Sequence, residues 1–111
     1  MYEYKATLLR VIDGDTVDCL IDLGFDVIIR ERVRLFGIDA PETRTRDLEE
    51  KQRGLESKQF VIDQLDKSNG QFIVETKYAR GKFGRTLGTI YLSNGNSLNS
   101  MLVEQGFANP Y

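Results

Sequence analysis

Three segments with alternating apolar and polar side chains fill the first third of the chain, and only short turns separate them. Residues 4–13 and 16–23 alternate on either side of an Asp-Gly-Asp turn, and residues 26–38 form a third run rich in β-branched residues. A period of two is typical of strands, and turns this short join antiparallel neighbours. The chain is therefore expected to begin with a three-stranded antiparallel meander.

The remaining residues carry two helical and two strand patterns. We expect a helix at residues 49–67, strands at 71–79 and 86–92, and a short helix at 97–105. The resulting order, βββ-α-ββ-α, is that of a five-stranded OB-fold barrel in a mainly β, α+β chain. Four side chains are expected to form the buried stripe of the longer helix: Leu55, Val61, Ile62 and Leu65. Gly70 and Gly106 follow the two helices, where a left-handed residue is favoured.

Size and composition predict one domain over residues 1–111. The chain is 41% hydrophobic and 29% charged, which suffices for a core and a polar surface. The N-terminus carries no basic stretch followed by an apolar run, and no apolar run is long enough to cross a membrane. We therefore expect a cytoplasmic monomer without membrane contact.

Histidine is absent and cysteine occurs once, which limits the kinds of catalytic, metal and disulfide site that the chain can form. These counts exclude Ser-His-Asp and Cys-His nucleophiles, histidine-ligated metals, an internal disulfide and a cysteine-cluster zinc site. Cys19 is expected to pack as a small apolar residue. Catalysis in this chain would depend on carboxylates, arginine, lysine, hydroxyls or a hard metal ion.

The net charge of −2 hides an uneven distribution. Residues 30–46 and 77–85 together hold nine bases and three acids, a net charge of +6, and the remainder carries −8. This asymmetry indicates an anion-binding region on an acidic body. Solvated strand faces and loops are the alternative explanation.

Acids gather at the expected ends of neighbouring strands. Asp15 is the last residue of the first turn and Asp39 lies at the end of the third strand, and oxygen ligands of this kind suit Ca²⁺ or Mg²⁺. Glu42 lies three residues after Asp39, within reach of a metal-bound water as a base. Each acidic motif alone is also an ordinary turn or strand exit.

Two arginines complete the candidate site. Arginine binds phosphate through parallel N–H donors and stays charged. Arg34 lies on the third strand, and Arg85 follows a glycine in a basic loop. An aspartyl-phosphatase motif is excluded by the strand order, and an EF-hand is excluded because Asp18 stands where that loop needs glycine.

The motifs and their order resemble the staphylococcal nuclease (thermonuclease) family. The resemblance covers most of the chain and is carried by four segments: residues 6–17 (ATLLRVIDGDTV), 34–43 (RLFGIDAPET), 82–85 (KFGR) and 102–108 (LVEQGFA). It implies an OB-fold, Ca²⁺-dependent phosphodiesterase that cuts DNA and RNA to 5′-hydroxyl and 3′-phosphate ends. The well-known member of the family has a further C-terminal helix, which we do not expect within residues 1–111.

The resemblance also implies roles for individual residues. Asp15, Asp39 and the Ala40 carbonyl would bind Ca²⁺, and Asp13 would be an acid close behind them. Glu42 would be the general base or would position the attacking water, and Arg34 and Arg85 would bind the phosphate. Contacts to the nucleic acid would come from Lys82, from Phe83 (a tyrosine in the well-known member) and from Tyr111.

Two other classes of protein fit the same residues. One is a non-catalytic OB-fold module that binds nucleic acid or protein, although the complete acid and arginine set favours an enzyme. The other is a calcium-binding structural domain, which would respond to Ca²⁺ without binding nucleic acid.

Overall fold

The computed structural model describes residues 2–76 and 86–111. Within these ranges the expected order of helices and strands is present, with two short strands added. The elements are β1 (Tyr2–Asp13), β2 (Thr16–Asp22), β3 (Ile28–Leu35), β4 (Ile38–Asp39), α1 (Leu48–Lys67), β5 (Gln71–Thr76), β6 (Thr86–Tyr91), α2 (Leu98–Glu104) and β7 (Asn109–Pro110). Neither described helix has the length and apolar character needed to cross a membrane.

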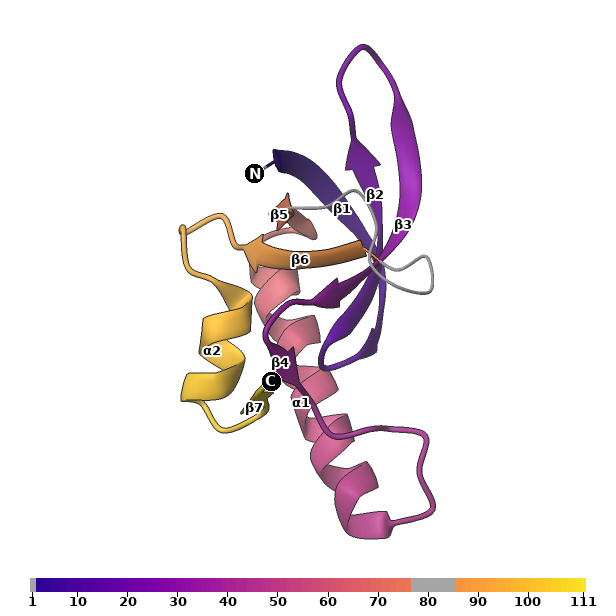
Figure 1. Cartoon of the computed structure of the whole chain (residues 1–111), viewed down its shortest axis with the longest axis vertical. Helices are drawn as coiled ribbons and strands as arrows, with labels where there is room; N and C mark the ends of the chain where they lie inside the picture. The colour runs from indigo at the N-terminus through magenta and orange to yellow at the C-terminus, as the bar shows by residue number, and fades with distance from the viewer. Residues whose placement is uncertain (1, 77–85) are drawn as a thin grey trace.

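Five of the described strands close into a barrel in the order β1-β2-β3-β6-β5. The β3–β6 pair is parallel and the other four pairs are antiparallel. This arrangement confirms the expected five-stranded OB-fold barrel (Figure 1). The part of the expected strand at residues 77–79 lies outside the described residues.

The expected third strand, residues 26–38, is interrupted. The Phe36 amide still donates to the Gly88 carbonyl at 2.8 Å, which continues the pairing of β3 with β6. Gly37 then adopts a left-handed φ of 80°, and the chain turns into β4. Because this φ favours glycine and breaks an extended strand, Asp39 belongs to a separate strand that pairs with β7.

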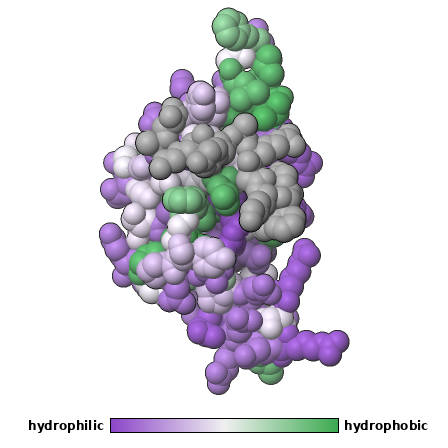
Figure 2. Space-filling view, viewed as in Figure 1, coloured by the Kyte–Doolittle hydropathy of each residue, from purple (hydrophilic) through white to green (hydrophobic). Residues whose placement is uncertain are grey.

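The hairpin of β2 and β3 extends away from the barrel (Figure 1), and its tip carries exposed apolar side chains (Figure 2). Phe25 and Asp26 have left-handed φ angles of 54° and 63°, which explains why β3 begins later than its apolar residues indicate. The exposed apolar residues of this tip are Leu23, Phe25, Val27 and Ile28.

Helix α1 buries a face made of small residues at one end and large residues at the other. The buried residues are Gly54, Ser57, Val61 and Leu65. Leu55 is 45% exposed, so the expectation that it lies in the buried stripe is wrong. Size explains the difference, because a helix that approaches neighbouring backbone closely needs glycine and serine at the contact.

The small end of this face packs directly on the turn between β1 and β2. A Cβ atom at Gly14 would lie 2.7 Å from the Ser57 Cβ, so only glycine fits there. The Ser57 hydroxyl donates to the Phe107 carbonyl at 2.6 Å, and the Phe60 and Phe107 rings stack with centroids 4.7 Å apart. Helix α1 thus joins the first turn of the chain to its C-terminal segment.

Left-handed residues end both helices. After α2, Gly106 has a φ of 79° and its amide donates to the Val103 carbonyl, as expected. After α1, Asn69 takes the position expected for Gly70, with a φ of 57°, and Gly70 follows it with a φ of 70°. Asparagine tolerates this conformation better than most residues.

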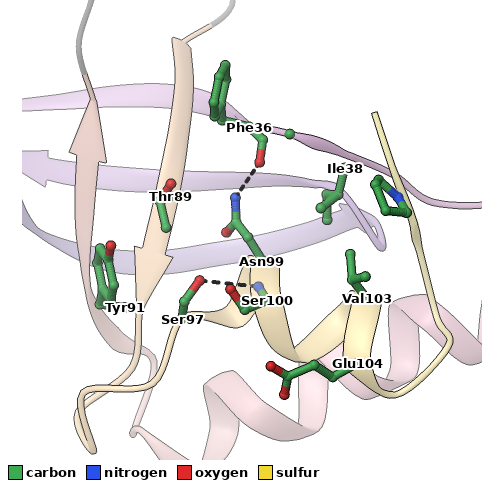
Figure 3. A pocket seen from close by; sticks show the side chains of 11 residues that line it. Phe36, Ile38, Thr89, Tyr91, Ser97, Asn99, Ser100, Val103 and Glu104 are labelled. Carbon is green, nitrogen blue, oxygen red and sulfur yellow. Dashed lines mark hydrogen bonds between the residues drawn. The ribbon is translucent and has the colours of Figure 1, made fainter.

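The buried amide of Asn99 holds α2 against the barrel. Its nitrogen donates to the Phe36 carbonyl at 2.9 Å and to the Gly88 carbonyl at 3.2 Å, and its oxygen accepts from the Ile90 amide. Figure 3 shows this side chain among those that line a cavity between α2, β6 and the turn that precedes β4. The cavity has a volume of about 510 Å³. Asn99 therefore fixes the strand break that sets the position of Asp39.

The same leucine-to-alanine substitution is expected to destabilise the protein to different extents at two positions of α1. Leu65 is fully buried and Leu55 is half exposed on the same helix. Leu65→Ala should lower the free energy of unfolding by about 2–5 kcal/mol. Leu55→Ala, the matched control, should lower it by less than about 1 kcal/mol. Urea titration measures both, and equal losses would contradict the assignment of the buried face.

A second prediction concerns Cys19, which is fully buried. Burial, with a smaller contribution from Asp18 and Glu31, raises the pKa of its thiol to about 12. The thiolate is the reactive form, so a thiol reagent at pH 8 should label the protein only after unfolding. Rapid labelling of the folded protein would show that Cys19 is accessible.

Candidate active site

A buried carboxylate, Asp15, lies in the turn between β1 and β2 and is only 5% exposed. Its Oδ2 accepts from the Ala40 amide and from Arg34 Nη1, both at 3.0 Å, and its Oδ1 accepts from the Thr16 hydroxyl at 2.9 Å. Its own carbonyl accepts from the Leu35 amide at 2.8 Å. Asp15 therefore connects the β1–β2 turn with the end of β3 and with the residue after β4.

The Arg34 guanidinium bridges two carboxylates. Its Nη1 contacts Asp15, and its Nη2 lies 3.4 Å from Asp39 Oδ1. Burial acts against the charged form of Arg34, but the carboxylates outweigh it, so the pKa of Arg34 is raised. The two acids, which lie 24 residues apart in the sequence, thus share one guanidinium.

The two carboxylates differ in their access to solvent. The side chain of Asp39 is 58% exposed, whereas that of Asp15 is 7% exposed. A ligand in solution would therefore meet Asp39 first, with Asp15 behind it and Arg34 beside both.

Glu42 is exposed and borders a cavity next to this cluster. The cavity has a volume of about 490 Å³ and is lined by Asp39, Ala40, Pro41, Glu42, Glu50, Arg53 and Asn109. Glu42 therefore shares a hollow with Asp39. Because the residue is exposed, its carboxylate is accessible to a molecule bound in this cavity.

Gly54 of α1 packs directly against the backbone of Glu42. A Cβ atom at this position would lie 2.7 Å from the Glu42 carbonyl carbon and 2.9 Å from the Pro41 oxygen. Only a residue without a side chain allows the helix and the Glu42 loop to approach so closely. Sequence reasoning missed Gly54, because an isolated helical glycine carries no local sign of what it contacts.

Asp13 connects the first turn to the same loop. Its Oδ1 accepts from the Thr43 hydroxyl at 2.6 Å. The structure therefore places this acid beside the residue that follows Glu42.

The C-terminal segment closes the other side of the cluster. Asp39 pairs with Asn109 in the β4–β7 sheet, and the Tyr111 amide donates to the Gly37 carbonyl at 2.9 Å. The centroid of the Tyr111 ring lies 5.9 Å from the Arg34 guanidinium carbon. Tyr111 is 88% exposed, so much of its ring remains open to a ligand.

Seven of the expected site residues are thus brought to one side of the molecule: Asp13, Asp15, Arg34, Asp39, Ala40, Glu42 and Tyr111. The other three, Lys82, Phe83 and Arg85, lie outside the described residues. Sequence reasoning did not find Arg53 or Asn109, which line the Glu42 cavity. Arg53 reaches the cavity from α1, and Asn109 reaches it because β7 pairs with β4. No local sequence motif indicates either position.

The donor set of the site suits a hard cation. Among the described residues, no three acidic, histidine or cysteine side chains gather around a common point. Two carboxylates nevertheless lie on either side of Arg34, and the more exposed one, Asp39, is accessible to an ion from solution. Carboxylate and carbonyl oxygens are the ligands that Ca²⁺ takes, together with water. The residues present therefore fit a calcium ion that keeps several water ligands.

Comparison with known proteins agrees with this arrangement. The family model described as staphylococcal nuclease homologue matches residues 32–111. Protein ParB of Escherichia coli is 31% identical over 98% of this chain and 58% of its own length. Endonuclease YhcR of Bacillus subtilis (strain 168) is 30% identical over 98% of this chain, but over only 9% of its own length.

An uncharacterized endonuclease of Escherichia coli O157:H7 is also similar, with 30% identity over 96% of this chain and 60% of that protein. The chain thus spans less than two thirds of the length of the relatives it matches. The family model nevertheless covers well over half of this chain. The protein therefore belongs to the staphylococcal nuclease homologue family.

Proposed function

We propose that residues 1–111 form one calcium-dependent nuclease domain, which hydrolyses phosphodiester bonds of DNA or RNA to 5′-hydroxyl and 3′-phosphate ends. The observation that carries the proposal is the Arg34 guanidinium held between Asp15 and Asp39 beside the Glu42 cavity. Family membership and two relatives named endonucleases support it. Nucleic acid is the substrate on this proposal.

Asp15, Asp39 and the Ala40 carbonyl would hold the calcium ion. When bound, the ion supplies positive charge that polarises a phosphoryl oxygen and lowers the pKa of a bound water. Asp15 is already oriented by its hydrogen bonds to Thr16 and Ala40, so this ligand is fixed before any ion binds. Asp13 would support the site from behind through its contact with Thr43.

Side chains of the protein would carry out the proton transfer and bind the phosphate. Glu42 would accept a proton from the attacking water at its carboxylate. Arg34 would turn from Asp39 toward the non-bridging phosphate oxygens, where negative charge develops. This exchange is reasonable because the Arg34–Asp39 contact is long, at 3.4 Å, and exposed. As the water oxygen bonds to phosphorus, the bond from phosphorus to the 5′-oxygen would break, and that oxygen would take a proton from solvent water. Arg85 would bind the phosphate near this leaving oxygen.

Three further residues would contact the nucleic acid outside the scissile phosphate. Lys82 would supply positive charge, and Phe83 and Tyr111 would offer rings to bases or sugars. Tyr111 already lies over Arg34, so a base stacked on it would be close to the phosphate that Arg34 binds.

Cleavage assays test both the calcium requirement and the role of Glu42 as the general base. Purified protein should cleave plasmid and single-stranded DNA or RNA with Ca²⁺, lose this activity in chelator and regain it with excess Ca²⁺. Glu42→Gln should reduce turnover by about 10²–10⁴-fold, because the general base is lost and the exposed loop is otherwise unchanged. Glu49→Gln, an equal charge change at an exposed position of α1, should leave turnover near that of the wild type.

Three results would contradict the proposal. Binding without cleavage at millimolar Ca²⁺ would indicate an OB-fold binding module. A Ca²⁺-dependent rise in melting temperature without nucleic-acid binding would indicate a structural calcium domain. Unchanged turnover in Glu42→Gln would remove this residue from the reaction.

Gly54→Ala tests whether the close contact with the Glu42 backbone matters. Alanine stabilises a helix by about 1 kcal/mol relative to glycine, but its Cβ atom would overlap the Glu42 and Pro41 backbone. We expect a lower kcat with little change in KM, because the base moves while the binding groups stay in place.

Gln52→Ala, at an exposed position of the same helix, is the control and should leave both constants unchanged. Steady-state kinetics measure the two constants, and urea titration checks the fold. A wild-type kcat for Gly54→Ala would show that the position of Glu42 does not depend on this contact.

A further inference from the structure

A second group of arginines lies on the outer face of β1, β2 and β3, next to the candidate site. Asp18 of β2 is at its centre. Its Oδ1 accepts from Arg32 Nε at 2.8 Å, and its Oδ2 accepts from Arg32 Nη2 at 3.1 Å and from Arg10 Nε at 3.4 Å. Arg30 Nη2 lies 3.9 Å from the same Oδ2. We call Arg10, Arg30, Arg32 and Asp18 the arginine cluster.

The strand pairing produces this cluster. Arg10 and Arg32 are the direct neighbours of Asp18 on either side, in β1 and β3. Arg30, Arg32 and Arg34 occupy alternate positions of β3, and alternate residues of a strand lie on one face about 6.7 Å apart. The cluster therefore continues the line that begins at Arg34 in the candidate site.

The cluster carries more positive charge than its own acid neutralises. Asp18 is 4% exposed, and the hydrogen bond from Arg32 holds its pKa below the usual value although burial opposes this. Three arginines around this one anion leave a net charge of +2. One arginine would suffice to pair a buried aspartate, so a purely structural role does not explain the other two.

The arginine side chains are also accessible. Arg10, Arg30 and Arg32 are 60%, 68% and 48% exposed. Asp18 binds one edge of the Arg32 guanidinium through Nε and Nη2, which leaves the donors of its other edge for a ligand. The arrangement is a set of solvent-accessible phosphate donors.

We infer that the arginine cluster is a backbone-phosphate subsite, which binds a nucleic-acid strand as it leaves the cleavage site along the outside of β3. The direction of the strand rests on the proposed nuclease function, but the binding of phosphate does not. Arginine contacts to phosphate position a nucleic acid without reading its sequence. The subsite therefore adds affinity for long substrates of any sequence.

The test removes two arginines and keeps Arg32, so that Asp18 stays paired and the barrel stays intact. The Arg10→Gln, Arg30→Gln double variant is made in the Glu42→Gln background, and binding of a fluorescent 20-nucleotide single strand is measured in chelator at several salt concentrations. The slope of log affinity against log salt should fall by about 1.4, roughly 0.7 for each phosphate that the variant no longer neutralises. Urea titration checks the fold.

Two matched variants sharpen the result. Lys67→Gln, which removes an exposed cation from the last turn of α1, should leave the salt slope unchanged. Asp18→Asn, which adds one positive charge to the face, should bind the strand more tightly than the parent protein. With Glu42 restored, hydrolysis of a single-nucleotide nitrophenyl phosphodiester should have the same kcat and KM in the double variant as in the wild type.

The outcomes separate the two proposals. A double variant with the salt slope and affinity of Lys67→Gln would overturn the phosphate subsite, as would an Asp18→Asn variant that binds no more tightly than its parent. Failure of the wild type to cleave any substrate would overturn the nuclease proposal. The chelator binding measurement would still decide the subsite.

Discussion

The buried carboxylate of Asp15 is the contact on which the other parts of the site depend. It receives donors from Thr16, Arg34 and Ala40, which belong to three different segments of the chain. A buried carboxylate without such partners would be strongly unfavourable. The requirement to satisfy this one charge therefore brings the end of β3 and the start of the Glu42 loop together. Loss of Asp15 would therefore disturb the positions of both segments, as well as remove a proposed calcium ligand.

The barrel and the position of the main motifs could be predicted from the sequence because both rest on local signals. Alternation defined the strands, and the Asp-Gly-Asp turn placed Asp15 beside β3. The interruption at Gly37 was missed because one left-handed glycine leaves the apolar pattern of residues 26–38 intact. The buried face of α1 was misjudged because Gly54 and Ser57 are buried by close backbone approach and not by hydrophobicity. The excess of positive charge in residues 30–46 indicated an anion-binding region, but only the strand pairing shows that Arg10 of β1 joins Arg30 and Arg32 around Asp18.

Charge is organised in two different ways on neighbouring parts of this protein. At the candidate site two acids surround Arg34, and in the arginine cluster three arginines surround Asp18. The first arrangement favours a cation and the second favours an anion. Alternate positions of β3 connect them, so one strand presents both. A net charge of −2 therefore says little about the partner of this surface.

The pairing of β7 with β4 has a consequence for how the protein is made. Residues 109–111 contact residues 37–39, so groups synthesised early are joined by groups synthesised much later. A ribosome produces a chain from its N-terminus, and the acids and Arg34 are thus exposed long before Asn109 and Tyr111 arrive. The complete arrangement cannot form while these residues are inside the ribosome.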